Sequence, residues 1–158
     1  MIRAGLAMAL LAVGVQPAAA LSCLRPDVTR SYGYADEAPD IYHVGRGTIA
    51  LDPGQTVRGA VDAAEPEPYS LTGTFRGETL TRDGFDRPVT LPVRLDLACA
   101  GPWCGTPPDG EAVMFLRRDA GAGYVLTIGP CPRDVFAATP DVEARVLSCL
   151  RDGGCSAE

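Results

Sequence analysis

Two stretches of the chain alternate apolar and polar residues, which is typical of strands with one buried face. Tyr69–Leu80 reads YSLTGTFRGETL, and Val89–Ala98 reads VTLPVRLDLA. Pro92 falls on the opposite face of the second stretch and, because it lacks an amide hydrogen, indicates an edge position or a bulge. We therefore predict two strands whose inward side chains include Leu71, Phe75, Leu91, Val93, Leu95 and Leu97.

Three further segments favour strands. Ile41–Leu51 is rich in β-branched and apolar residues and ends at an Asp-Pro-Gly turn signal. Ala112–Arg117 and Tyr124–Ile128 are separated by a glycine-containing segment that is typical of a hairpin. Between the strands, Thr81–Arg87 is expected to be a polar turn and Cys99–Gly110 a loop rich in glycine and proline.

A helix is expected at each end of this strand region. Pro26–Glu37 carries apolar residues at near-helical spacing, and the helix ends by Pro39. Near the C-terminus, Thr139 is a good N-cap, and Gly153 stops the helix. The face of this last helix that is expected to pack on the strands carries Val142 and Val146.

Five strands flanked by two helices predict a mainly β domain. We expect a five-stranded barrel of the oligonucleotide/oligosaccharide-binding type, the OB-fold, stapled by disulfides; a small sandwich is the alternative. A chain of 158 residues is long enough for one such domain, which we place at residues 21–158.

Residues 1–20 have the pattern of a cleavable signal peptide. Arg3 precedes an apolar stretch from Ala4 to Val15, and three alanines follow a Gln-Pro break. Cleavage after Ala20 fits this pattern best. The two alternatives are cleavage directly before Cys23 and lipidation of Cys23. We therefore expect a periplasmic or secreted protein without a transmembrane helix after cleavage, since about twelve apolar residues do not span a membrane.

The charge of the mature chain argues against nucleic acid as a partner. The full chain has 14 basic and 20 acidic side chains, and loss of Arg3 leaves 13 basic and 20 acidic, a net charge of -7. A surface of that sign repels phosphate backbones and anionic lipid.

Six cysteines in an exported chain predict three disulfides, for which fifteen pairings are possible. Cys99 and Cys104 bracket a short loop, and Gly153-Gly154 can fold Cys155 back onto Cys149. Cys23 and Cys131 are left as the third pair, although links from Cys23 to Cys104 or Cys149 remain open. The sequence has no Cys-x-x-Cys pair, the motif typical of zinc knuckles and redox centres, and we expect no cofactor.

The order of these features resembles the netrin-like domain of the tissue inhibitors of metalloproteinases. It consists of an N-terminal cysteine, a short helix ending in Tyr34-Ala35-Asp36, Trp103-Cys104-Gly105, a hairpin followed at once by Cys131, and a closing helix. The resemblance implies a netrin-like barrel and also the Cys23–Cys131 bond. In that family the amine and carbonyl of an N-terminal cysteine chelate the zinc of a protease. Cys23 holds that position here, but the chain lacks the family's Cys-x-Cys pair.

Candidate chemistry is sparse. A catalytic triad would have to use His43, the single histidine, which we interpret instead as a half-exposed strand residue. Asp36, Glu37 and Asp40 precede it and are interpreted as a solvated helix end rather than metal ligands. Trp103 is expected to pack over a barrel mouth or, alternatively, to contact a partner.

The function expected from these observations is a non-catalytic exported module that binds a protein or an envelope ligand. The alternatives are an inhibitor of an extracytoplasmic metalloprotease or other hydrolase, and an enzyme of unrecognised type.

Overall fold

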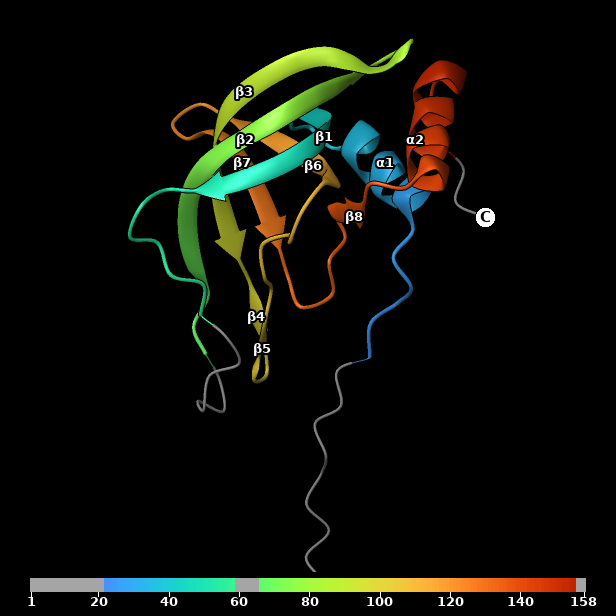
Figure 1. Cartoon of the computed structure of the whole chain (residues 1–158). Helices are drawn as coiled ribbons and strands as arrows, with labels where there is room; N and C mark the ends of the chain where they lie inside the picture. The colour runs from blue at the N-terminus through green and yellow to red at the C-terminus, as the bar shows by residue number, and fades with distance from the viewer. Residues whose placement is uncertain (1–21, 59–65, 156–158) are drawn as a thin grey trace, which may run out of the picture.

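The computed structural model describes residues 22–58 and 66–155, so the proposed signal peptide at residues 1–20 lies outside the described residues (Figure 1). The elements of the described part are α1 (Val28–Glu37), β1 (Tyr42–Leu51), β2 (Tyr69–Thr81), β3 (Gly84–Leu97), β4 (Cys99–Ala100), β5 (Trp103–Cys104), β6 (Ala112–Asp119), β7 (Gly123–Ile128), β8 (Val135–Ala137) and α2 (Pro140–Asp152). No helix among these residues has the length and apolarity needed to cross a membrane.

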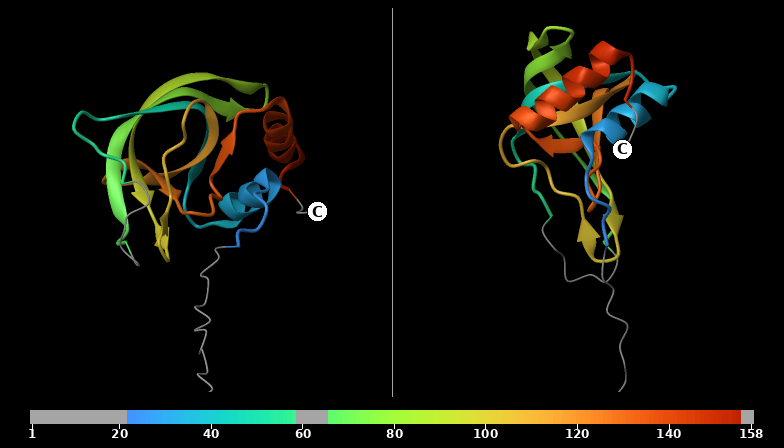
Figure 2. Two further views of the ribbon diagram at one scale, coloured as in Figure 1. Left: turned by 60° about the horizontal axis from the view of Figure 1, so that its bottom comes forward. Right: turned by 90° about the vertical axis from the view of Figure 1, so that its right-hand side faces the viewer.

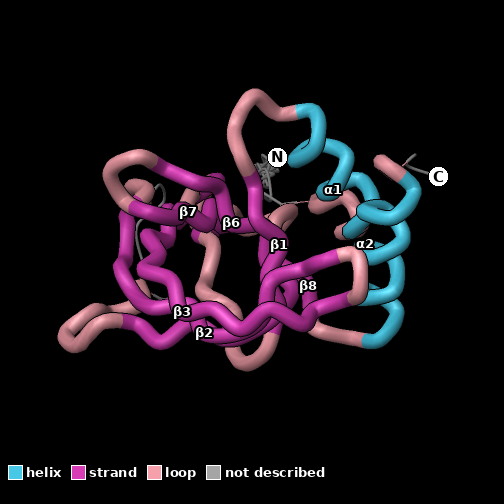
Figure 3. The backbone as a smooth tube through the Cα atoms, turned by 90° about the horizontal axis from the view of Figure 1, so that it is seen from above, coloured by secondary structure: helices cyan, strands magenta, loops and turns pink. Residues whose placement is uncertain are grey.

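Five strands close into a barrel, as the sequence predicts. Their order is β1-β2-β3-β7-β6, and β6 pairs with β1 to complete the ring (Figure 3). The β3–β7 pair is parallel, and the other four pairs of the ring are antiparallel. A short further strand, β8, pairs with β6 outside the ring. The barrel prediction is therefore confirmed, and the sandwich alternative is wrong.

Glycines allow β1 to serve two neighbours at once. Residues Gly45 to Gly47 of β1 pair both with β2 and with β6. A side chain at Gly45 would overlap the ring of Phe75 inside the barrel, and one at Gly47 would overlap the backbone of Arg76 and Gly77. Close approach of the two backbones at this corner therefore requires residues without a Cβ atom.

The barrel interior is filled by the alternating apolar residues. Leu71, Phe75, Val93, Leu95 and Leu97 are buried as predicted, whereas Leu91 is only partly buried against the same cluster. Strands β6 and β7 complete the core with Ala112, Met114, Leu116, Leu126 and Ile128.

A second apolar cluster joins the helices to the outside of the barrel. Val113 and Phe115 of β6 point away from the barrel interior and contact Val28 of α1 and Val146 of α2 within this cluster. Val142 packs against the same cluster, so the predicted docking face of the last helix is confirmed. Figure 2 shows the two helices together on one side of the barrel.

An arginine adds polar contacts between α2 and the barrel. The guanidinium of Arg46 on β1 donates to Glu78 on β2 and, over 3.0 Å, to Glu143 on α2. The hydrogen bond that Arg46 donates to Glu78, and secondarily the negative charge of Glu143, raise the pKa of Arg46. The Nε atom of the same side chain is buried without a hydrogen-bond partner.

Several boundaries differ from the sequence prediction. The strand expected from Val89 begins at Gly84, and the expected turn at Thr81–Arg87 is mostly strand. That first part of β3 pairs with β2 alone, since pairing with β7 starts at Val93, so polar residues are tolerated there. Pro92 is the last residue of β3 before pairing with β7 begins, which agrees with its predicted edge position.

The first helix begins later than Pro26 because Asp27 is its N-cap. Thr139 caps α2 as predicted, and Gly153 ends that helix with a φ of 77°.

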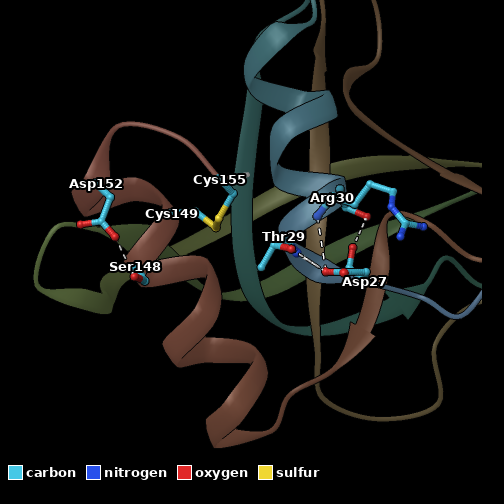
Figure 4. The surroundings of a disulfide bond; sticks show 8 residues. Asp27, Thr29, Arg30, Ser148, Cys149, Asp152 and Cys155 are labelled. Atoms are coloured by element: carbon cyan, nitrogen blue, oxygen red, sulfur yellow. Dashed lines mark hydrogen bonds between the residues drawn. A yellow bond between two sulfur atoms is a disulfide. The ribbon is translucent and has the colours of Figure 1, made fainter. Parts of the chain in front are cut away.

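Each of the three disulfides joins the cysteines paired in the sequence analysis. Cys23 is bonded to Cys131, Cys99 to Cys104, and Cys149 to Cys155. Figure 4 shows how the chain turns back after α2 to bring Cys155 onto the buried Cys149. Such bonds persist in oxidising, extracytoplasmic compartments, so the structure agrees with export.

Candidate functional site

A small disulfide-tied hairpin extends from the barrel and carries Trp103. The hairpin consists of β4 and β5, in which Cys99 lies opposite Cys104. At its base, the Ala98 N–H donates to the Ile128 carbonyl over 2.9 Å, which fixes the hairpin to the end of β7. Trp103 is 49% exposed, so about half of its surface is available to a partner.

The N-terminal arm, residues 22–27, lies at the same end of the barrel as the hairpin (Figures 1 and 2). Its Cys23 is held by the disulfide to Cys131, three residues after β7 ends. Leu24 beside it is 82% exposed. We name the hairpin, the arm and residues 129–133 together the disulfide edge, because two of the three disulfides lie in it.

A groove runs along the arm. It has a volume of about 310 Å³ and is bordered by the arm, the first turns of α1 and the segment after β7. Three arginines line it: Arg25, Arg30 and Arg133. We name it the arm groove.

The acidic residue of the arm groove is already engaged. Asp27 accepts hydrogen bonds from the Thr29 hydroxyl at 2.7 Å and from the N–H groups of Thr29 and Arg30. These bonds, above all the one from the Thr29 hydroxyl, lower the pKa of Asp27. Asp27 therefore acts as a helix cap, and its charge is partly neutralised by the helix N-terminus.

Arg133 is held in place by its neighbours. Its Nε donates to Asp134 over 3.1 Å, a bond that raises the pKa of Arg133, and its guanidinium lies 5.5 Å from the centre of the Tyr34 ring. The Arg133 carbonyl accepts from the Ser31 hydroxyl at 2.6 Å. Helix α1 and the segment after β7 are thereby joined at the groove.

His43 lies elsewhere, beside a second cleft of about 330 Å³. It is half-buried on β1, as predicted, and its ring meets that of Tyr124 edge to face at 5.3 Å between centres. Burial, and secondarily the charge of Arg118, lower the pKa of His43. Asp36 also lines this cleft, but no hydrogen bond joins Asp36 to His43 in the described residues.

The acidic residues near His43 do not assemble into a metal centre. Glu37 and Asp40 do not line the cleft, and Asp40 instead approaches Arg117 at 3.9 Å. Across residues 22–58 and 66–155, no three histidine, cysteine, aspartate or glutamate side chains are grouped as metal ligands would be.

A third depression, of about 470 Å³, lies on the outside of β2 and β3. Its charged residues satisfy each other, because Arg94 donates to both oxygens of Asp96 and Ser70 donates to one of them. Burial opposes ionisation of Asp96, but these hydrogen bonds lower its pKa overall. No uncompensated charge is left there for a ligand.

The arm groove is not evident in the sequence, because its arginines are far apart in the chain. Arg25 and Arg133 are separated by more than a hundred residues, and the Cys23–Cys131 bond brings their segments together. The predicted Cys23–Cys131 bond is the one feature of the sequence that indicates that the segments of Arg25 and Arg133 lie close together.

No protein-family model, curated protein or solved structure matches this chain.

Proposed function

We propose that the protein is a non-catalytic binding module of the cell envelope or the extracellular space, which engages a protein partner through the disulfide edge. The observation that carries the proposal is Trp103, half exposed at a hairpin that is tied across by Cys99–Cys104. Tryptophan is enriched at the energetic centres of protein interfaces because it buries a large area and loses little rotamer freedom.

The remainder of the barrel supports this proposal. Its interior is lined by large apolar side chains such as Phe75 and Leu95, both fully buried, so the proposal places recognition on the outer surface. Leu24 adds a second exposed apolar side chain at the same edge. In this proposal residues 1–20 direct export and are removed, and the mature chain begins at Leu21.

The test is capture of envelope proteins by the purified mature protein. We expect Trp103→Ala to lose a specific partner that the wild type retains, because truncation of a hot-spot residue, a class in which tryptophan is enriched, costs about 2 kcal/mol or more. The matched control is Ile41→Ala, which removes another exposed apolar side chain that lies outside the disulfide edge, beside Arg118 near the end of β6. Equal melting temperatures establish that both variants fold, and equal capture by the two variants would contradict the proposal.

Inhibition of an extracytoplasmic hydrolase is the second candidate. Cys23 is exposed at the disulfide edge, and the netrin-like resemblance gives its amine and carbonyl a zinc-binding role. That chemistry requires cleavage directly before Cys23. Zinc-protease assays with proteins that begin at Cys23 and at Leu21 decide this candidate: we expect inhibition by the first form alone, and no inhibition by either form would exclude it.

A further inference from the structure

The arm groove has a charge opposite to that of the protein. Three guanidinium groups line it, whereas the chain without the signal has 13 basic and 20 acidic side chains. Within the described residues, neither Arg25 nor Arg30 forms an ion pair, whereas Arg133 is paired with Asp134 through its Nε atom alone. Asp27 is occupied in capping α1. An anionic group entering the groove would therefore meet the unpaired positive charges of Arg25 and Arg30.

The arginines come from three separate segments that are fastened together. Arg25 lies on the arm, which the Cys23–Cys131 bond ties to the segment after β7. Arg30 lies on α1, and the Ser31–Arg133 hydrogen bond ties that helix to the same segment. The three segments that carry the arginines are thus joined before any ligand arrives, so binding does not have to order them relative to one another.

Apolar surface accompanies these charges. Leu24 and Tyr34 are exposed at the groove, and Pro26 and Pro132 also line it. A small inorganic anion has no group that would use this apolar surface. A peptide segment that presents carboxylates and apolar side chains together would use both kinds of surface.

We propose that the arm groove binds an acidic segment of the partner protein, in which carboxylates meet Arg25, Arg30 and Arg133 while neighbouring apolar side chains contact Leu24 and Tyr34. The inference rests on the proposed function, since it gives the chemistry of the partner at the disulfide edge. Binding in the arm groove would then be electrostatic as well as apolar, so the affinity for the acidic segment falls as the salt concentration rises.

The test measures binding of a defined peptide to the mature protein by fluorescence anisotropy. The probe is a hexapeptide of alternating glutamate and leucine with a neutral fluorophore, and its counterpart has glutamine in place of glutamate. We expect the glutamate peptide to bind and the glutamine peptide to bind much more weakly. The double variant Arg25→Gln/Arg30→Gln should weaken binding of the glutamate peptide by about fivefold or more.

The matched control is Arg76→Gln/Arg87→Gln, which changes the net charge equally at two exposed arginines outside the groove. Equal weakening by both double variants would overturn the inference, because overall charge would then explain the binding. Equal binding of the two peptides, or full displacement of the glutamate peptide by inorganic phosphate at equimolar concentration, would also overturn it.

These outcomes are separable from those of the capture experiment. If Trp103→Ala loses a partner but the glutamate peptide does not bind the wild type, the inference fails and the proposed function stands. If the peptide binds as expected but no partner depends on Trp103, the proposed function fails and the groove remains an acidic-peptide site.

Discussion

Removal of the Cys23–Cys131 bond should destabilise the protein more than removal of the hairpin bond. In the chain-entropy account, a disulfide stabilises by restricting the unfolded chain, and the effect grows with the loop it closes. The first bond has a sequence separation of 108 and the Cys99–Cys104 bond a separation of 5. The entropy relation then gives about 4.8 and about 2.1 kcal/mol, a difference of about 2.7 kcal/mol.

The comparison uses two double variants, Cys23→Ser/Cys131→Ser and Cys99→Ser/Cys104→Ser. None of the four cysteines is fully buried, so the new hydroxyl groups stay within reach of water. Urea unfolding under non-reducing conditions gives the free energy of unfolding of each variant and of the wild type. Equal losses, or a larger loss for the hairpin variant, would refute the argument from loop length.

Three further predictions concern local features. Gly47→Ala should cost about 1 to 3 kcal/mol of unfolding free energy, because its methyl group would overlap the β2 backbone, whereas Gly121→Ala should be near neutral; urea unfolding of both tests this. Asp27→Ala should cost about 1 kcal/mol at pH 7 through loss of the helix cap. The folded state lowers the pKa of Asp27, so the stability difference between Asp27→Ala and the wild type should be present above pH 3.8 and disappear as the pH falls through the lowered value. Urea unfolding at several pH values tests this, and a difference that persists in acid contradicts it. His43 should titrate below 6.5 in an NMR experiment, and Arg118→Gln should raise its midpoint; a midpoint at or above 6.5 in the wild type contradicts the burial described for this ring.

The barrel strands were predictable where burial on one face imposed alternation. In Leu91 to Leu97 every second residue faces the core, so the pattern fixes both the strand and its inward side. The first residues of β3 lack that constraint, because they extend beyond β7 and pair with β2 alone. The three residues of β8 are too few to show any period.

The candidate site was less predictable than the fold. Trp103 could be singled out as the one tryptophan, but its exposure depends on how the hairpin base is fixed to Ile128. The arm groove depends on contacts between segments far apart in the chain, such as the Ser31–Arg133 hydrogen bond. Local sequence patterns contain no information on such pairs.

The bond across the β4–β5 hairpin has a consequence for where the protein can act. With Cys99 and Cys104 joined, the turn that presents Trp103 is closed independently of any partner. Reduction of this bond would leave a free loop, and the tryptophan would then have to be ordered during binding at an entropic cost of about 0.5 to 1.5 kcal/mol or more. In the proposed function, recognition would thus be strongest in an oxidising compartment, and a chain retained among cytosolic thiols would be a weaker binder before it is exported.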